Sequence, residues 1–373
     1  MRVVLTGALD RALWKGRREL LEDWRRRGWD IHVVLPDVEL DTHGNRFEWV
    51  TLHRIPLFRA SMNPARDLRT IRAYRRVFKK IQPDAVLAYN PKPVLYSGIA
   101  LGGRPRTRFI PMVTGRGALE KRSGVRGQVA HSALRTLYRR SLKRADAILF
   151  QNEDDRAFFI ETVAGFDPGA ATVIPGSGVN LERYAPHPLA NGPLRFLVIA
   201  RLLEDKGVRE FVEAAHRMDD GGLNARFRVV GGWNPDHPHG IPASDLDLWK
   251  KRGVVEFTGA VEDVRPHLAW CSVLCHASYA EGTPRAVLEA MSTGRAIITT
   301  DAPGCRHTII PGRSGFLVPP RDSRSLQERM EWFVENSEAL DPFGQAARKR
   351  AEDVFDVRQV VQLVSSAMLS GAD

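Results

Sequence analysis

Short apolar segments of four to six residues alternate with helical patterns along this 373-residue chain, and this alternation constrains its fold more than any other feature. The first half contains five such segments, separated by helical patterns such as Leu13–Arg27. Because buried strands separated by helices form parallel sheets, the pattern predicts a doubly wound α/β domain. The strands are expected at Val3–Thr6, Ile31–Leu35, Ala85–Tyr89, Phe109–Val113 and Ala147–Phe150.

The alternation stops at Tyr184–Leu194, where three prolines and a glycine predict a linker, and then restarts. We therefore expect two Rossmann-like α/β domains facing a cleft, over residues 1–187 and 188–355. The helical tail Phe343–Leu369 has its own apolar stripe and is expected to pack across the domains, with about 356–373 packing back on the first. The second set of strands is expected at Arg195–Ala200, Phe227–Val230, Val254–Phe257, Val273–Ala277 and Ala296–Thr299.

The formal charge of +11 is confined to the first half of the chain. Lys and Arg outnumber Asp and Glu by 33 to 19 over residues 1–187, but the ratio is 22 to 25 over residues 188–373. The excess is concentrated in two amphipathic helical patterns, Leu68–Ile81 and Leu134–Arg144. A core-facing stripe with a solvated basic face explains either helix alone, whereas two in one domain favour an anionic partner, either lipid headgroups or nucleic acid.

Cysteine content and hydropathy indicate a protein of a reducing compartment. Three cysteines do not suit a disulfide framework, and no run of eighteen apolar residues occurs. We expect a cytoplasmic protein, peripheral on the inner face of the membrane. Cys271, Cys275 and His276 could suggest zinc, but their segment has the pattern of a buried strand, and Asp245 and Asp247 lie where a helix begins. We therefore expect no metal ion.

One segment, EGTPRAVLE, sets Glu281 and Glu289 around a Gly-Thr-Pro turn that opens a helix predicted over Pro284 to Met291. The N–H groups at the start of a helix favour an anion such as a diphosphate. Glu281 could then face a sugar ring, and Glu289 could accept hydrogen bonds from ribose hydroxyls. An ordinary surface helix with two solvated glutamates could have the same sequence, so the surrounding sequence must distinguish the two interpretations.

The ends of the preceding predicted strands carry residues suited to a nucleotide. Arg201 and Lys206 follow the first strand of the second half, and two such cations can neutralise a diphosphate leaving group. A salt bridge to Glu204 or Asp205 would explain either residue singly. Glycines after the next two strands, among them Gly232 and Gly259, would let the backbone approach a ligand closely.

These motifs, together with GFLV at 315–318, resemble the family-4 retaining glycosyltransferases in order and spacing. The resemblance implies a GT-B fold, two Rossmann-like domains with the donor held mainly by the second. It implies that Arg201 and Lys206 bind the diphosphate, that Glu281 lies at the donor sugar and that Glu289 holds the ribose. The implied donor-binding set is Arg201, Lys206, Gly232, Gly259, Glu281, Gly282, Thr283, Pro284 and Glu289, with Glu281, Arg201 and Lys206 as its catalytic members.

The first half is similar to a subgroup of that family that extends polyprenyl-diphosphate-linked sugars in bacterial surface-polysaccharide or glycan assembly. The similarity lies in Arg59 to Pro64, NPKPV at 90–94 and VTGRG at 113–117. Arg116 departs from the usual Gly-Leu-Gly turn, and the histidine of better-known members is absent at this strand end. Candidates for contact with the donor sugar or acceptor are Gly7, Asn63, Lys92, Thr114 and Gly115.

The resemblance implies transfer of a sugar from a nucleoside-diphosphate donor, expected to be UDP-linked and conceivably an N-acetylhexosamine, to a lipid-linked acceptor, without a metal or other cofactor. Attack would come from the face that the diphosphate leaves. Two alternatives remain open from the sequence: a UDP-sugar epimerase of the same fold, and a non-catalytic nucleic-acid-binding protein using the basic half. The complete donor motif speaks against both, so no nucleic-acid partner is expected.

Overall fold

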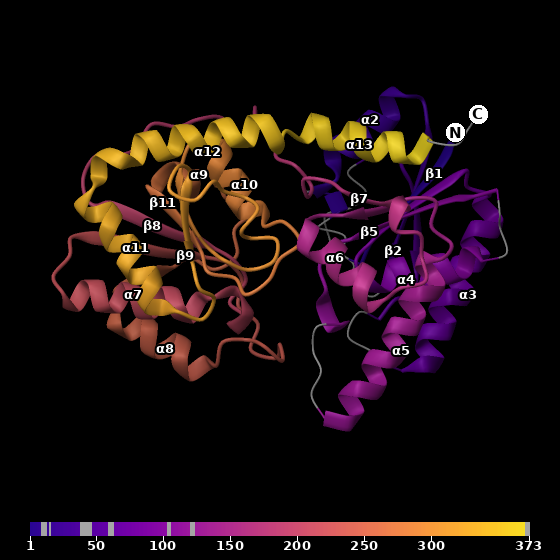
Figure 1. The fold of residues 1–373 in the computed structure, drawn as a ribbon, viewed down its shortest axis with the longest axis horizontal. Coiled ribbons are helices and arrows are strands. Elements are labelled where there is room, and N and C mark those ends of the chain that lie inside the picture. Colours follow the sequence, from indigo (N-terminus) through magenta and orange to yellow (C-terminus); the bar gives the residue numbers. More distant parts are fainter. Residues whose placement is uncertain are drawn as a thin grey trace. The chain divides into compact units, whose positions relative to one another are not determined.

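The computed structural model describes residues 1–8, 13–14, 16–37, 47–58, 63–102, 106–119 and 124–369 (Figure 1). The chain divides into two compact units. Unit 1 consists of Met1–Ser177 together with Arg358–Asp373, and unit 2 of Gly178–Val357. Each unit is built around its own parallel sheet, so the predicted α/β class with two Rossmann-like domains is confirmed.

The sheet of unit 1 has seven strands in the order β3-β2-β1-β4-β5-β6-β7. All its pairings are parallel, for example Leu5 with Val33 on one side and with Leu87 on the other. The strand order reverses beside β1, the point where open α/β sheets collect ligands. The strands are β1 Arg2–Thr6, β2 Asp30–Pro36, β3 Thr51–Ile55, β4 Ala85–Tyr89, β5 Arg108–Val113, β6 Ile148–Phe150 and β7 Ala171–Val173.

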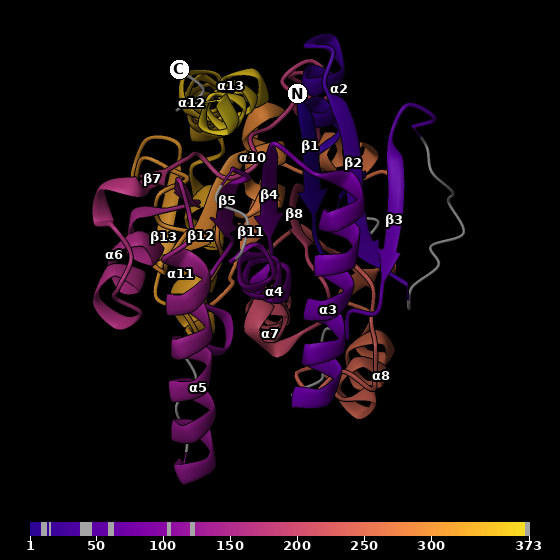
Figure 2. The same ribbon diagram turned by 90° about the vertical axis from the view of Figure 1, so that its right-hand side faces the viewer.

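Three long helices of unit 1 lie side by side, with α4 packed against both α3 and α5 (Figure 2). The amphipathic α3 begins at Pro64 after an Asn63 N-cap and buries Tyr74, Phe78 and Ile81 in the core. Leu68, predicted on that buried stripe, is instead 43% exposed. The helices are α2 Arg18–Arg26, α3 Pro64–Ile81, α4 Pro91–Leu101, α5 Gly124–Leu142 and α6 Glu153–Thr162, with short turns η1 Gly117–Leu119 and η2 Pro168–Ala170.

The sheet of unit 2 has six parallel strands in the order β10-β9-β8-β11-β12-β13. Its order reverses between β8 and β11, which places the ends of these two strands side by side. The sheet is buried among apolar side chains that include Phe196, Phe211 and Ile298. The strands are β8 Leu194–Ile199, β9 Ala225–Val230, β10 Val255–Phe257, β11 Val273–His276, β12 Ala296–Thr300 and β13 Gly315–Val318.

The helices of unit 2 follow its strands as the alternating pattern predicts. One boundary differs, because Pro284 is the N-cap of α10 with an extended ψ of 110°, and Arg285 is the first helical residue. The helices are α7 Val208–Asp220, α8 Ala243–Arg252, α9 Arg265–Trp270, α10 Arg285–Ser292, α11 Ser323–Glu335 and α12 Leu340–Val354, with short turns η3 Glu204–Lys206 and η4 Ser337–Ala339.

The helical tail consists of two helices, α12 in unit 2 and α13 Val357–Leu369, nearly all of which belongs to unit 1. It breaks at Asp356, which pairs with Val179 in a short parallel bridge. Within unit 1, Ser365 Oγ accepts a hydrogen bond from Trp24 Nε1 at 3.2 Å. The first division between the units lies at Ser177–Gly178 rather than at 187–188, since residues such as Val179 and Tyr184 pack in the core of unit 2.

Every strand predicted from apolar segments is present within one or two residues of its expected ends. The sequence reasoning did not assign β13, Gly315–Val318, as a strand, and it missed β3, Thr51–Ile55. This strand contains His53 and Arg54 and lies at the edge of its sheet, where polar residues interrupt the apolar pattern.

Candidate functional site

The candidate site of unit 2 lies at the carboxyl ends of β8, β9, β10 and β11, which are neighbours in its sheet. Because the strands are parallel, the residues that follow them gather at one edge. Gly231 allows two of these turns to meet, since a Cβ there would lie 1.7 Å from the Ala200 carbonyl oxygen. Gly232 accepts from the Leu202 N–H, and Gly259, with φ of +75°, accepts from the Gly231 N–H.

The structure brings two predicted residues from different strand ends into direct contact. Lys206 Nζ, from η3 after β8, donates to Glu281 Oε1 in the loop after β11 at 2.6 Å. Their side chains are 17% and 22% exposed, so the ion pair is largely shielded from water. Glu204 forms an ion pair with Arg209, so the salt bridge between Lys206 and Glu204 that the sequence allowed does not form.

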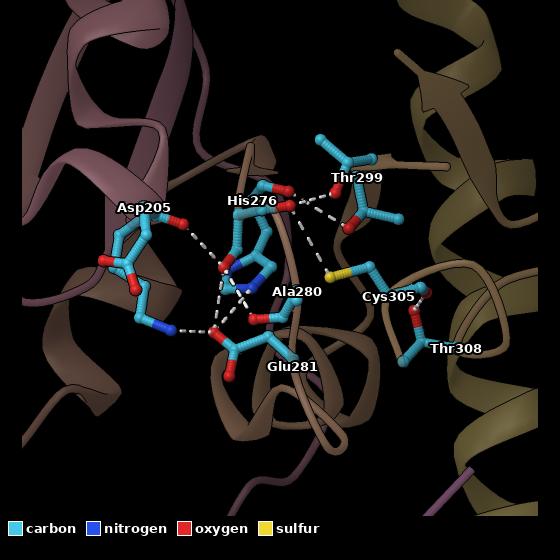
Figure 3. Close-up of polar contacts among 10 residues, drawn as sticks. Asp205, His276, Ala280, Glu281, Thr299, Cys305 and Thr308 are labelled. Atoms are coloured by element: carbon cyan, nitrogen blue, oxygen red, sulfur yellow. Dashed lines mark hydrogen bonds and ion pairs between the residues drawn. The ribbon is translucent and has the colours of Figure 1, made fainter. Parts of the chain in front are cut away.

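The loop that carries Glu281 is held by hydrogen bonds from both sides. Ser278 Oγ lies 3.1 Å from the Asp205 carbonyl oxygen and 3.2 Å from Glu281 Oε1. The Glu281 N–H donates to the Pro303 carbonyl at 3.0 Å. Gly304, with φ of +75°, packs so closely that a Cβ would lie 2.1 Å from the Glu281 carbonyl oxygen. The carboxylate is therefore placed by a preorganised loop (Figure 3).

His276, the last residue of β11, completes this cluster (Figure 3). Its side chain is 4% exposed, and Nε2 lies 3.5 Å from Glu281 Oε1. Burial opposes its charged form, but interactions with Cys305 and Glu281 raise the pKa of His276 to about 9. Burial likewise opposes ionisation of Glu281, but His276 and Lys206 lower its pKa to about 2. Both pKa shifts thus favour an ionised Glu281 beside Lys206 and His276.

Glu289 lies on α10, in its predicted place more than one turn from the loop, and is 8% exposed. Arg285 Nη2 donates to Glu289 Oε1 at 3.2 Å, one helical turn away. Tyr184 is its other neighbour: burial, with the Glu289 charge close by, raises the pKa of Tyr184. Glu289 is therefore held in place by two side chains and is not solvated. This excludes the alternative of an ordinary surface helix with two solvated glutamates.

Arg201 differs from Lys206 in being exposed at the end of β8. Within the described ranges it forms no ion pair, including none with Glu204 or Asp205. Gly282 and Pro284 are buried, and Thr283 is half-buried in the turn between them. The predicted donor-binding residues that follow β8, β9, β10 and β11 thus lie at one sheet edge, with Arg201 exposed and Lys206 half-buried.

The candidates in unit 1 also gather at one edge, after the neighbouring strands β1, β4 and β5. Gly7 follows β1 and touches the Tyr89 ring, where a Cβ would lie 2.4 Å from Cζ. Thr114 and Gly115 follow β5 and are half-buried. Lys92, at the start of α4, forms an ion pair with Asp67 of α3, with Lys92 Nζ 2.9 Å from Asp67 Oδ1.

Asn63 acts as the N-cap of α3, its Oδ1 accepting from the Ala65 N–H at 2.9 Å. Arg59 lies outside the residues that the structure describes. Arg116, at the departure from the usual turn, points into unit 1: its Nε donates to Asp155 Oδ1 at 2.9 Å, and its guanidinium covers the Phe158 ring at 4.7 Å. The structural use of Arg116 explains this departure.

The remaining metal candidates have structural roles. Cys271 and Cys275 are buried, and burial raises the pKa of the Cys271 thiol to about 12. Asp245 lies in the first turn of α8 and pairs with Arg209 at 2.5 Å. Over the ranges described, no group of three His, Cys, Asp or Glu side chains is placed to hold a metal ion.

Sequence reasoning missed His276, which was placed with the buried cysteines of β11. Its side chain does share their burial, but the loop after β11 turns Glu281 back onto it. A histidine five residues before a predicted site glutamate was the available signal. This spacing was not decisive, because the residues after a strand have no periodic pattern that would predict that the loop turns back onto the strand end.

The fold and the site define a GT-B glycosyltransferase: two Rossmann-like units, one with a cation-and-carboxylate cluster at its strand ends. Residues 18–183 match the model of glycosyltransferase family 4, and residues 193–336 match that of the glycosyl transferases group 1. The chain belongs to this family of glycosyltransferases, as its motifs predicted.

Two curated relatives are similar over about 90% of their length. The chain is 25% identical over 349 residues to the N,N'-diacetylbacillosaminyl-diphospho-undecaprenol alpha-1,3-N-acetylgalactosaminyltransferase of Campylobacter jejuni, covering 90% of each chain. It is 25% identical over 362 residues to the capsular polysaccharide biosynthesis glycosyltransferase CapM of Staphylococcus aureus, covering 92% of this chain and 90% of that protein.

Solved structures share the fold at lower identity. A sucrose-phosphate synthase from Thermosynechococcus elongatus superposes with a TM-score of 0.83 at 16% identity, covering 98% of both chains. Anabaena HepE, solved in complex with UDP, gives a TM-score of 0.79 at 18% identity, covering 99% of this chain and all of that one. These similarities confirm the GT-B fold.

Proposed function

We propose that this protein is a retaining glycosyltransferase that moves a sugar, in particular an N-acetylhexosamine, from a UDP-linked donor to a lipid-linked saccharide in polysaccharide or glycan assembly. The contact between Lys206 and Glu281 carries the proposal. It places a cation that could bind a phosphate beside a carboxylate that could accept hydrogen bonds from a sugar, at one edge of the sheet. Support for the acceptor comes from the Campylobacter relative, whose name specifies a diphospho-undecaprenol-linked sugar.

The reaction needs its leaving diphosphate stabilised more than it needs a strong base. Arg201 and Lys206 would neutralise the charge that develops on the diphosphate as the glycosidic bond breaks. The acceptor hydroxyl would attack from the same face, and a donor phosphate oxygen would take its proton. Glu281, ionised at neutral pH, would orient a hydroxyl of the donor sugar, and Glu289 would accept from the ribose. We propose that this chemistry proceeds without a metal ion.

We further propose that unit 1 binds the acceptor at an anionic membrane surface. Five cations of α3 lie on the face opposite its buried residues, and all are exposed. In the portion of the chain described, none of the five forms an ion pair; they are Arg69, Arg72, Arg76, Lys79 and Lys80. No described helix is long and apolar enough to cross a bilayer. Location at the cytoplasmic face of the membrane is part of this proposal.

A donor screen tests the activity. The wild-type protein and Arg201→Ala are incubated with UDP- and GDP-sugars, and thermal stabilisation and hydrolysis are measured. We expect stabilisation by a UDP-sugar in the wild type and its loss in the variant. Binding of no sugar nucleotide would overturn the proposal.

A positive donor is then incubated with polyprenyl-diphosphate-linked sugars, with and without EDTA. Transfer with retained anomeric configuration, read by NMR, and an unchanged rate in EDTA are expected. Epimerised donor without transfer would indicate the epimerase, an inverted product would refute retention, and an EDTA-sensitive rate would refute metal independence. Salt-sensitive binding of DNA or RNA without donor binding would indicate a nucleic-acid-binding protein.

A further inference from the structure

His276 is a buried histidine whose hydrogen-bonding groups are not used by the fold. Its side chain is 4% exposed at the end of β11. In the part of the structure described, neither ring nitrogen makes a hydrogen bond of ordinary geometry. Burying either form of the ring without a hydrogen bond costs free energy, and the charged form more than the neutral one, so its placement requires a charged neighbour.

The groups that face the ring include this charged neighbour. Glu281 Oε1, from the loop after β11, lies 3.5 Å from Nε2 and also receives Lys206 Nζ at 2.6 Å. Cys305, from the turn after β12, also raises the pKa of His276, and its thiol lies 4.0 Å from the Ser278 carbonyl oxygen (Figure 3). Asp205 contributes its backbone carbonyl to this region, as acceptor for Ser278 Oγ and the Tyr279 N–H. The charged partner of His276 is thus Glu281.

We propose that His276 is a positioning residue, a buried imidazolium that keeps Glu281 ionised and oriented when Lys206 leaves it for the diphosphate of the donor. This inference rests on the proposed function, in which Lys206 binds the diphosphate. Without a donor, Lys206 and His276 share one carboxylate oxygen. With a donor, Lys206 changes partner and His276 remains.

The need for a second cation follows from the burial of Glu281. Its side chain is 22% exposed, and departure of Lys206 would raise the pKa of such a shielded carboxylate, which favours the protonated form. A protonated Glu281 would be a weaker acceptor for a sugar hydroxyl, because hydrogen bonds to charged groups are about twice as strong as neutral ones. His276, raised to a pKa of about 9, stays charged over the neutral range.

The charge of His276 can be measured without any donor. Long-range ¹H–¹⁵N NMR reports whether each ring nitrogen carries a proton, and the His276→Gln protein identifies the signal by its disappearance. We expect both nitrogens to be protonated at pH 7.5, with titration near pH 9. A neutral imidazole at pH 7.5 would overturn the proposal, whatever the activity of the enzyme.

Kinetics then separate positioning from packing. His276→Leu fills the buried space without a charge, and His276→Gln keeps polarity without a charge. We expect kcat in both variants to fall about tenfold between pH 8 and pH 5.5, which requires the pKa of Glu281 in the donor complex to rise to about one unit above pH 5.5. The wild type should stay flat in this range, with less effect of the substitutions on KM than on kcat.

His216→Leu is the matched control. His216 is a half-buried histidine of α7 in the same unit, and one of its ring nitrogens is also buried without a hydrogen bond among the residues described. Burial lowers its pKa, so it carries no charge at neutral pH. Its substitution should leave the pH profile unchanged. If His276→Leu gives a flat pH profile as well, His276 has only a packing role and the proposal fails.

Titration with UDP distinguishes this failure from failure of the proposed function. We expect UDP to shift the His276 ring signals while both nitrogens stay protonated, because Lys206 leaves Glu281. Loss of a ring proton on UDP binding would overturn the proposal. A protonated ring with no UDP binding at all would overturn the assigned donor while leaving the charged pair of His276 and Glu281 established.

Discussion

Lys206 and Glu281 are 75 positions apart in sequence, yet Lys206 Nζ donates to Glu281 Oε1 at 2.6 Å. The two residues follow β8 and β11, whose order in the sheet brings their carboxyl ends together. A cation suited to a phosphate and a carboxylate suited to a sugar thus share one edge. The proposed reaction requires this relationship, and each part of it can be tested.

Replacing Lys206 by Ala should remove one of the two cations that stabilise the leaving diphosphate. By comparison with the loss of one oxyanion donor, we expect kcat to fall by about 10²–10³, or about 2.7–4 kcal/mol of transition-state stabilisation. Arg201→Ala should have a similar effect. The measurement is steady-state turnover of the sugar nucleotide identified by the donor screen.

Arg209→Ala is the control for this comparison. Arg209 is a half-buried cation near the same strand edge, but it pairs with Glu204 and Asp245. Its loss should alter stability and leave kcat near the wild-type value. Unchanged turnover in Lys206→Ala would refute the role of Lys206.

The position of Glu281 depends on Gly304. An added Cβ would lie 2.1 Å from the Glu281 carbonyl oxygen, so Gly304→Ala must displace the loop that holds the carboxylate. Gly312 has nearly the same φ, +74°, with nothing within 4 Å of an added Cβ. Both substitutions should cost about 1 kcal/mol through backbone strain, and only Gly304→Ala should also reduce kcat. Equal kcat in the two variants would show that the loop adapts.

The pair of His276 and Glu281 should make the stability of unit 2 depend on pH in a defined direction. The pKa of His276 rises from 6.5 to about 9, so its contribution is complete below pH 6.5 and is lost as the pH rises through 9. By linkage this amounts to at most about 3 kcal/mol. The lowered pKa of Glu281 acts oppositely, giving stability above pH 4.5 that is lost as the pH falls toward 2.

Hydrogen exchange of peptides spanning residues 273–291 measures this dependence, after correction for the intrinsic effect of pH on exchange. Protection should decrease between pH 6.5 and 9 in the wild type. His276→Leu should abolish the decrease, because it removes the titrating group. The same slope in both proteins would assign the pH dependence to other residues.

Much of this fold could be predicted because its strands are short, apolar and regularly separated. The sheet edge at which Arg201, Lys206 and Glu281 meet also followed from the sequence, since parallel strands end on the same side. The order of strands could not be read from periodicity. That Lys206 contacts Glu281 rather than its neighbour Glu204 depends on β11 lying beside β8, a tertiary relationship.

Side-chain partners were the least predictable part of the site. Lys92 pairs with Asp67 of α3, and Asn63 serves as a helix cap; neither contact followed from local pattern, and the role of both residues at a donor sugar or acceptor stays a prediction. Leu68 continued an apolar stripe that the fold does not bury at that position. Such outcomes depend on which helix packs beside which, and local pattern does not specify them.

Arg116 should matter for stability rather than for chemistry. Asp155 is 1% exposed, and removal of Arg116 leaves its buried charge without its cation, at a cost of about 3 kcal/mol to unit 1. The double variant Arg116→Ala/Asp155→Asn should regain part of this loss, whereas Arg135→Ala on the exposed face of α5 should have little effect. Chemical denaturation provides the measurement, and an Arg116→Ala protein as stable as the wild type would contradict the assignment.

The basic face of α3 should determine binding to anionic membranes. Neutralising Arg69, Arg72 and Arg76 to Gln removes three exposed charges from one helix face, at about 1 kcal/mol each near an anionic surface. Binding to vesicles with anionic lipid should therefore weaken by about 100-fold, and binding of the wild type should fall with added salt. Sedimentation with anionic and neutral vesicles measures both effects.

The matched control neutralises the three exposed cations 250–252 at the end of α8, which lie in unit 2. If the two triple variants lose the same affinity, net charge rather than α3 governs binding, and membrane docking through unit 1 is refuted.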